Sequence, residues 1–160
     1  MKIISIDPGY ERLGIAVVEK VDGGSKEKLI FSECFRTSVK DEFNDRLLQV
    51  GQRIKEVITE YKPEALTIEK LYFSSNQKTA IQVSQVIGSI IFLAKDSGLK
   101  VFEYTPLQIK LAVAGNGKGS KDDVITMLRY LIDLPNKKML DDEYDAIAVG
   151  LTYFAHERFE

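Results

Sequence analysis

Three short apolar segments alternate with turn-forming residues in the first part of the chain. Residues 2–6, 13–18 and 28–36 are rich in Ile, Val and Phe, and the sequences DPGYER and VDGGSKE separate them. Short apolar runs bounded by Gly, Pro and Asp are typical of β-strands. The pattern therefore predicts three strands arranged as an antiparallel meander.

The middle of the chain changes to the spacing of helices. Apolar residues recur at steps of three and four over residues 41–61, which predicts an amphipathic helix that ends before Pro63. A short strand over residues 65–69, a helix over residues 76–95 and a fifth strand over residues 100–104 are expected to follow.

Local signals mark the starts of three further helices. A Thr-Pro pair opens residues 105–113, a Ser-x-x-Asp pattern that resembles a capping box opens residues 120–134, and a last helix covers about residues 141–156. Three strands followed by alternating helices and strands predict an α/β fold, in which a five-stranded mixed sheet carries helices on both faces.

Composition limits the classes of protein that this chain can belong to. Its 160 residues are 44% hydrophobic and 29% charged, which predicts one globular domain over residues 1–160. No run of about 18 apolar residues predicts a membrane span, and no secretory signal is recognised, so we expect a cytoplasmic protein. A single cysteine, Cys34, excludes an internal disulfide and a cysteine-rich zinc site, and we expect it to fill space in a strand.

The charge of the chain is unevenly distributed. The net charge is −2, but residues 70–121 hold seven lysines and two acids, a charge of +5, which leaves −7 for the remainder. This asymmetry is compatible with a basic face for nucleic acid on an acidic body, and equally with lysines scattered in solvent.

Four acidic residues stand where the predicted fold would bring them together. Asp7 and Glu69 end two strands, while Asp142 and Asp145 lie three residues apart on the last helix. Taken singly, Asp7 could cap a turn, Glu69 could pair with Lys70, and the helical acids could simply complement the helix dipole. Together, four carboxylates in one small volume require cations, and oxygen ligands favour Mg²⁺. The hypothesis is a pair of Mg²⁺ ions that assist hydrolysis of a phosphodiester.

Four sequence motifs resemble the RuvC family of Holliday-junction resolvases. The motifs are IDPGYERLGIAV, IEKLYFSSN, FEYTPLQIKLAVAGNGKGSK and DEYDAIAVG, and they follow one another in the family's order and spacing. The resemblance spans nearly the whole chain. It implies a ribonuclease H-like fold and a homodimer that cuts four-way DNA junctions symmetrically during recombination and repair. It also implies two Mg²⁺ ions per active site, with Mn²⁺ as a substitute, and a branch-migration complex of the RuvA and RuvB type as partner.

The resemblance also assigns roles to particular residues. The family's metal-binding and catalytic acids fall on Asp7, Glu69, Asp142 and Asp145. The neighbouring Asp141 leaves open which of Asp141 and Asp142 is a ligand, and Glu143-Tyr144 replaces the small residues usual at this point. The residues expected to contact DNA are Tyr72, Phe73, Asn76, Lys110, Lys118 and Lys121.

Aromatic side chains in a loop suit stacking on unpaired bases, and lysines among glycines suit contact with phosphates. The apolar stripe of the helix over residues 76–95 is wider than one sheet face requires. It predicts either a fully buried helix or a two-fold contact between two copies of the chain.

Three other functions remain open at this point. IDPGYERLGIAV also resembles the first phosphate-binding hairpin of actin and sugar-kinase-type ATPases, although those enzymes need two such domains. A resolvase-like nuclease of the YqgF type would share the fold and some of the acids. A noncatalytic junction-binding protein is the third alternative.

Overall fold

The centre of the molecule is a five-stranded mixed sheet, as predicted. The computed structural model describes residues 1–21, 23, 26–71 and 77–156. The strand order is β3-β2-β1-β4-β5, in which β1, β2 and β3 pair antiparallel and β1, β4 and β5 pair parallel. The strands are β1 (Lys2–Asp7), β2 (Arg12–Glu19), β3 (Lys28–Arg36), β4 (Ala65–Glu69) and β5 (Lys100–Tyr104).

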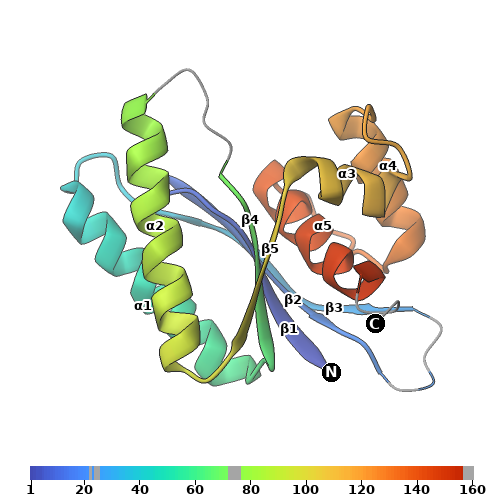
Figure 1. Ribbon diagram of the computed structural model, residues 1–160, viewed down its shortest axis with the longest axis horizontal. Coiled ribbons are helices and arrows are strands. Elements are labelled where there is room, and N and C mark those ends of the chain that lie inside the picture. The colour runs from blue at the N-terminus through green and yellow to red at the C-terminus, as the bar shows by residue number, and fades with distance from the viewer. Residues whose placement is uncertain (22, 24–25, 72–76, 157–160) are drawn as a thin grey trace.

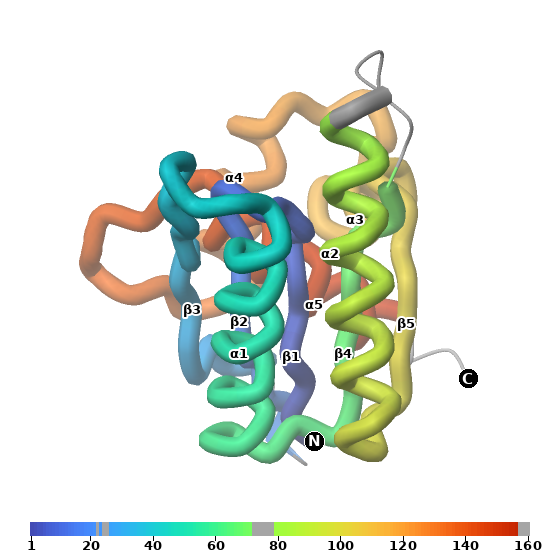
Figure 2. Tube along the Cα trace, turned by 90° about the vertical axis from the view of Figure 1, so that its left-hand side faces the viewer, coloured from blue at the N-terminus to red at the C-terminus, as the bar shows by residue number. Residues whose placement is uncertain are grey.

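Helices cover both faces of this sheet (Figure 1). On one face lie α1 and α2, side by side across the strands (Figure 2). On the other face α5 packs against β1 and β2, and α3 and α4 pack on α5. No helix in these described parts is long and apolar enough to cross a membrane. The helices are α1 (Phe43–Tyr61), α2 (Gln77–Asp96), α3 (Pro106–Ala114), α4 (Lys121–Leu131) and α5 (Asp141–His156).

Strand β1 lies at the centre of the sheet and its side chains enter two separate cores. Ile3 packs on the α5 side, whereas Ile4 and Ile6 pack on the side of α1 and α2, and all three are fully buried. A strand buried on both faces has no need for alternating polar residues. The apolar run before Asp7 is therefore explained by the position of β1 between two helical layers.

The helix ends agree with their local signals, with one exception. Thr105 and Ser120 form the predicted capping boxes, and Lys62 ends α1 in the left-handed conformation just before Pro63. Helix α4 ends at Leu131, three residues earlier than predicted. The cause is Ile132, which adopts an extended backbone and buries its side chain completely.

Helix α5 crosses the sheet at a very short distance because a glycine faces β1. A Cβ atom at Gly150 would lie 2.8 Å from the Ser5 Oγ and 3.0 Å from a methyl group of Val18. Ser5 and Thr152 are fully buried beside this crossing. The close approach fixes the distance between the helix and the sheet, and with it the place of the acids at the start of α5.

Replacing Gly150 with Ala is expected to lower the free energy of unfolding by about 1–3 kcal/mol, because the added methyl group overfills this contact. Gly88→Ala in α2 is the matched control, since its added methyl group would meet nothing within 4 Å apart from its chain neighbours and its own helix backbone. Ala favours a helix over Gly by about 1 kcal/mol, so the control should be stabilised. Denaturant unfolding measures both, and stabilisation of both variants would contradict a close helix–sheet contact.

Candidate active site

Two strands deliver a carboxylate to the same edge of the sheet. Asp7 ends β1 and Glu69 ends β4, and these strands are parallel neighbours in which Ile6 pairs with Ile68. The next residue of each strand therefore lies at the same edge, as the sequence predicted. This is the edge at which ligands of open α/β sheets collect.

The start of α5 reaches this edge over a glycine of β2. Gly14 pairs with Asp7 on one side and with Cys34 on the other. A Cβ at Gly14 would overlap the backbone of Asp142 and would lie 3.0 Å from the Asp7 Cβ. Any larger residue at position 14 would hold the first turn of α5 away from Asp7.

The four predicted acids act on one another electrostatically. The pKa of Asp7 is raised to about 8, chiefly by burial and then, in decreasing order, by the charges of Asp145, Glu69 and Asp142. Burial also raises the pKa values of Glu69 and Asp145, and the Asp145 charge adds to the effect on Glu69. Of the two adjacent acids at the start of α5, Asp142 is the one that affects Asp7.

Two cationic side chains bind acids of this group. Lys121 Nζ lies 2.8 Å from Asp145 Oδ2 and 3.4 Å from Asp141 Oδ2. Arg12 donates a charge-assisted hydrogen bond to Asp142 Oδ2. These cations offset part of the electrostatic repulsion between the carboxylates.

The four acids form a candidate donor set for a metal ion. Its four carboxylates supply only oxygen atoms, the ligand type that Mg²⁺ and Mn²⁺ take, and Asp145, Glu69 and Asp142 each contribute to the raised pKa of Asp7. Among the described residues, no three His, Cys, Asp or Glu side chains form a preassembled metal-binding group. In this conformation Asp142 and Asp145 are directed to Arg12 and Lys121 instead. The donor chemistry fits a hard divalent ion, and the ligand set is not preassembled.

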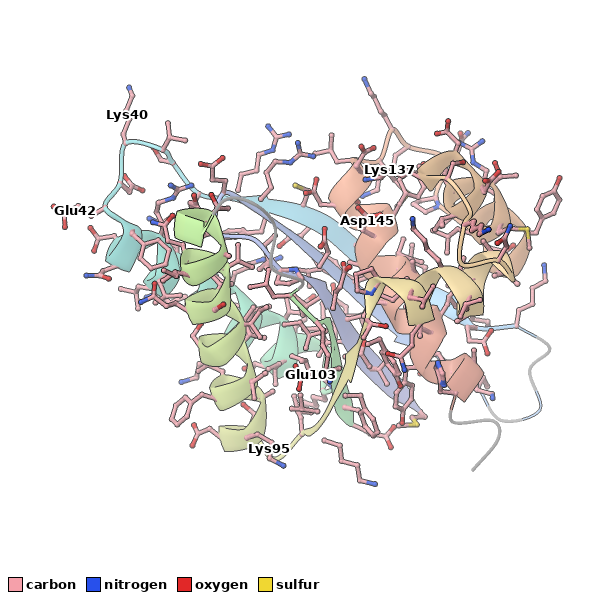
Figure 3. All side chains as sticks on the ribbon, turned by 45° about the horizontal axis from the view of Figure 1, so that its top comes forward. Lys40, Glu42, Lys95, Glu103, Lys137 and Asp145 are labelled. Atoms are coloured by element: carbon pink, nitrogen blue, oxygen red, sulfur yellow. The ribbon has the colours of Figure 1, made fainter. Side chains whose placement is uncertain are left out.

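A cavity of about 290 Å³ opens beside the carboxylates. Its charged lining residues are Glu69 and Asp145, which are acidic, and Lys110 and Lys121, which are basic. Figure 3 labels Asp145 on α5. The remaining lining residues are Pro106, Ile109, Val124 and Ala148. The cavity is large enough for a phosphate group and places both lysines near it.

Of the other residues predicted to contact DNA, the structure describes Lys118 alone. Lys118 is exposed in the loop between α3 and α4, where its backbone N–H donates to Asn116 Oδ1 at 2.9 Å. Tyr72, Phe73 and Asn76 lie outside the described residues.

Arg12 and Glu143 belong to the surroundings of the site, and sequence reasoning missed both. The Glu143 carboxylate is buried and accepts hydrogen bonds from Ser32 Oγ at 2.8 Å, Lys137 Nζ at 3.0 Å and the Leu140 N–H at 2.9 Å. These bonds fasten the first turn of α5 to β3. The one available signal was the three-residue spacing from Leu140 to Glu143, which matches half of a capping box.

Comparisons with known proteins identify the family of this chain. The family model for the crossover junction endodeoxyribonuclease RuvC matches residues 3–153. The curated relative from Petrotoga mobilis is 40% identical over 99% of this chain and 94% of its own length. The relative from Halothermothrix orenii is 38% identical over 96% of this chain and 92% of its own length. Both are crossover junction endodeoxyribonucleases RuvC.

Solved structures give the same result. RuvC of Thermus thermophilus, in complex with a Holliday junction substrate, superposes with a TM-score of 0.92 at 31% identity, covering 99% of this chain and 96% of that one. The yeast mitochondrial Holliday junction resolvase Ydc2 has a TM-score of 0.75 at 10% identity over 98% of this chain and 78% of its own, which shows a shared fold. The chain belongs to the RuvC family of crossover junction endodeoxyribonucleases.

Proposed function

We propose that this protein is an endonuclease that resolves four-way DNA junctions by symmetric, metal-dependent hydrolysis of phosphodiesters. The observation that carries the proposal is the group of acids at one sheet edge: Asp7, Glu69, Asp142 and Asp145. Its family relatives are crossover junction endodeoxyribonucleases, and one solved relative binds a Holliday junction substrate. The family match covers most of the chain, so the ATPase and YqgF-type alternatives have no comparable support.

The same four acids would hold two divalent ions, Mg²⁺ or in its place Mn²⁺. Bound there, such ions supply a water of lowered pKa and stabilise the leaving oxygen of a phosphodiester. Asp7 has to release its proton to act as a ligand, because only the carboxylate binds a hard cation well. Asp145 and Asp142 have to share or give up their bonds to Lys121 and Arg12.

Lysines beside the acids would hold the DNA. Lys110 and Lys121 line the cavity next to Glu69 and Asp145, so a backbone phosphate placed there would meet positive charge on one side. Lys118 would add a contact from the exposed loop between α3 and α4. Tyr72, Phe73 and Asn76 are proposed, from the family resemblance, to contact the junction.

A homodimer would place two such sites on one junction, which has two equivalent positions to cut. Large apolar side chains are exposed on the face formed by α1 and α2, including Phe92 at 68%, Ile81 at 61% and Leu48 at 59%. A groove between α1 and α2 is lined by Leu47, Leu48, Gly51, Phe92 and Leu93 among others. An apolar face of this kind suits an isologous contact.

Two further parts of the proposal come from the sequence analysis, the first from composition and the second from the family resemblance. We place the protein in the cytoplasm, and we expect it to act together with a branch-migration complex of the RuvA and RuvB type.

Incubation with Mg²⁺ and end-labelled four-way junctions should give paired symmetric nicks, with linear duplex left intact. Asp7→Asn removes a charged ligand and should slow cutting by at least about 100-fold, while the variant still folds and binds junctions. Chelation of divalent ions should stop the wild type in the same way. Full activity in Asp7→Asn, or equal cutting of linear duplex, would contradict the proposal.

The stability of the metal-free protein should depend on pH through Asp7. Its folded pKa of about 8 lies above its usual value of 3.8, so between these values the folded state holds a proton that the unfolded state has lost. The free energy of unfolding therefore falls as pH rises through this window.

Asn stays neutral, so the melting temperature of Asp7→Asn should exceed that of the wild type at about pH 9 and approach it near pH 4. Asp133→Asn, which removes an exposed charge, is the control. A pH-independent difference between Asp7→Asn and the wild type would show that Asp7 is not buried among charges.

Sedimentation at micromolar concentration should show a dimer. Phe92→Glu should weaken dimerisation about 30-fold or more, because it places a charge in an apolar interface. Leu107→Glu is the matched control, since Leu107 is 57% exposed on α3, away from α1 and α2. A wild-type monomer, or equal effects of the two variants, would contradict an interface at α1 and α2.

A further inference from the structure

Two arginines lie directly opposite each other at the site edge of the sheet. Arg12 is the first residue of β2, Arg36 is the last residue of β3, and the two are partners in the antiparallel register. Side chains of such partners lie on the same face of the sheet, where like charges repel. Both arginines are exposed to solvent. An anion bound beside this pair would reduce the repulsion between the two guanidinium groups.

The arginine pair is adjacent to the carboxylates. Gly14 and Cys34 form the next same-face pair of β2 and β3, and Gly14 lies under Asp142. Cys34 Sγ lies 3.6 Å from Asp142 Oδ2. The arginine pair therefore lies one same-face step from the thiol that contacts Asp142, at the edge of the site.

The carboxylates near this pair balance only one of its two charges. Asp142 accepts a hydrogen bond from Arg12. No carboxylate of the residues in the described ranges forms an ion pair with Arg36. The other nearby cation, Lys137, is bound to the buried Glu143. Arg36 thus offers a positive charge and several N–H donors to a ligand from outside the protein.

We propose that Arg36, next to Arg12, binds a backbone phosphate of the DNA on the β2–β3 side of the carboxylates. The inference rests on the proposed junction nuclease function. It adds a second group of cationic side chains to the DNA-binding site. Lys110 and Lys121 belong to α3 and α4, on the other side of the acids. A guanidinium binds two phosphate oxygens with two parallel hydrogen bonds, a geometry that lysine lacks. The DNA strand would then be held by positive charge on both sides of the acids.

The salt dependence of junction binding tests this phosphate contact. Binding of a fluorescent four-way junction is measured by anisotropy in chelator, so that no cutting occurs. Arg36→Gln should lower the slope of log affinity against log salt by about 0.9, the value for one lost phosphate contact. The ratio of variant to wild-type dissociation constants should then shrink about 3.5-fold between about 50 and about 200 mM salt.

Two further variants separate binding from structure. Arg36→Lys keeps the charge and should keep the wild-type slope. Lys100→Gln removes an exposed charge at the start of β5, the opposite end of the sheet, and should leave the slope unchanged. An unchanged slope in Arg36→Gln, or an equal loss in Arg36→Lys, would overturn the proposal. Cutting of junctions by the wild type is measured in parallel, so that failure of the nuclease function itself is seen separately.

Discussion

The crossing of α5 over β1 and β2 is the contact on which the rest of the site depends. Strands β1 and β4 bring only Asp7 and Glu69 to the sheet edge, and both remaining acids, Asp142 and Asp145, come from the first two turns of α5. Glycines 14 and 150 let the helix and the sheet approach at two points along its length. The site therefore depends on two positions that carry no side chain, and on Glu143, which fastens the first of these turns to β3.

The same contact creates an electrostatic cost. Buried carboxylates at one edge destabilise the folded state, as the raised pKa of Asp7 shows. Lys121 and Arg12 reduce that cost by pairing with Asp145 and Asp142. In the proposed function, divalent ions and DNA phosphates both bind at the sheet edge where Lys121 and Arg12 lie. Before the ions or the DNA have bound, these two cations reduce the repulsion between the acids.

Sequence reasoning predicted the elements well because their signals are local. The apolar run before Asp7, the capping residues Thr105 and Ser120, and the three-residue spacing of Asp142 and Asp145 each depend on a few neighbouring positions. Arg12 and Glu143 were missed because their partners, Asp142 and Ser32, lie more than 100 positions away, with no periodic pattern to connect them. Ile132 ended α4 early for a similar reason, since its burial depends on tertiary packing.

The order of the elements along the chain has a consequence for biosynthesis. Asp7 leaves the ribosome before Asp145, because β1 precedes α5 and all the other described elements lie between them along the chain. Because folding proceeds as the chain is made, the sheet can pair on a nascent chain before the final acids emerge. A truncated product that stops before α5 would keep all five strands and lack half of its carboxylates. Under the proposed function, such a product has only two of the four metal ligands and is not expected to cut DNA.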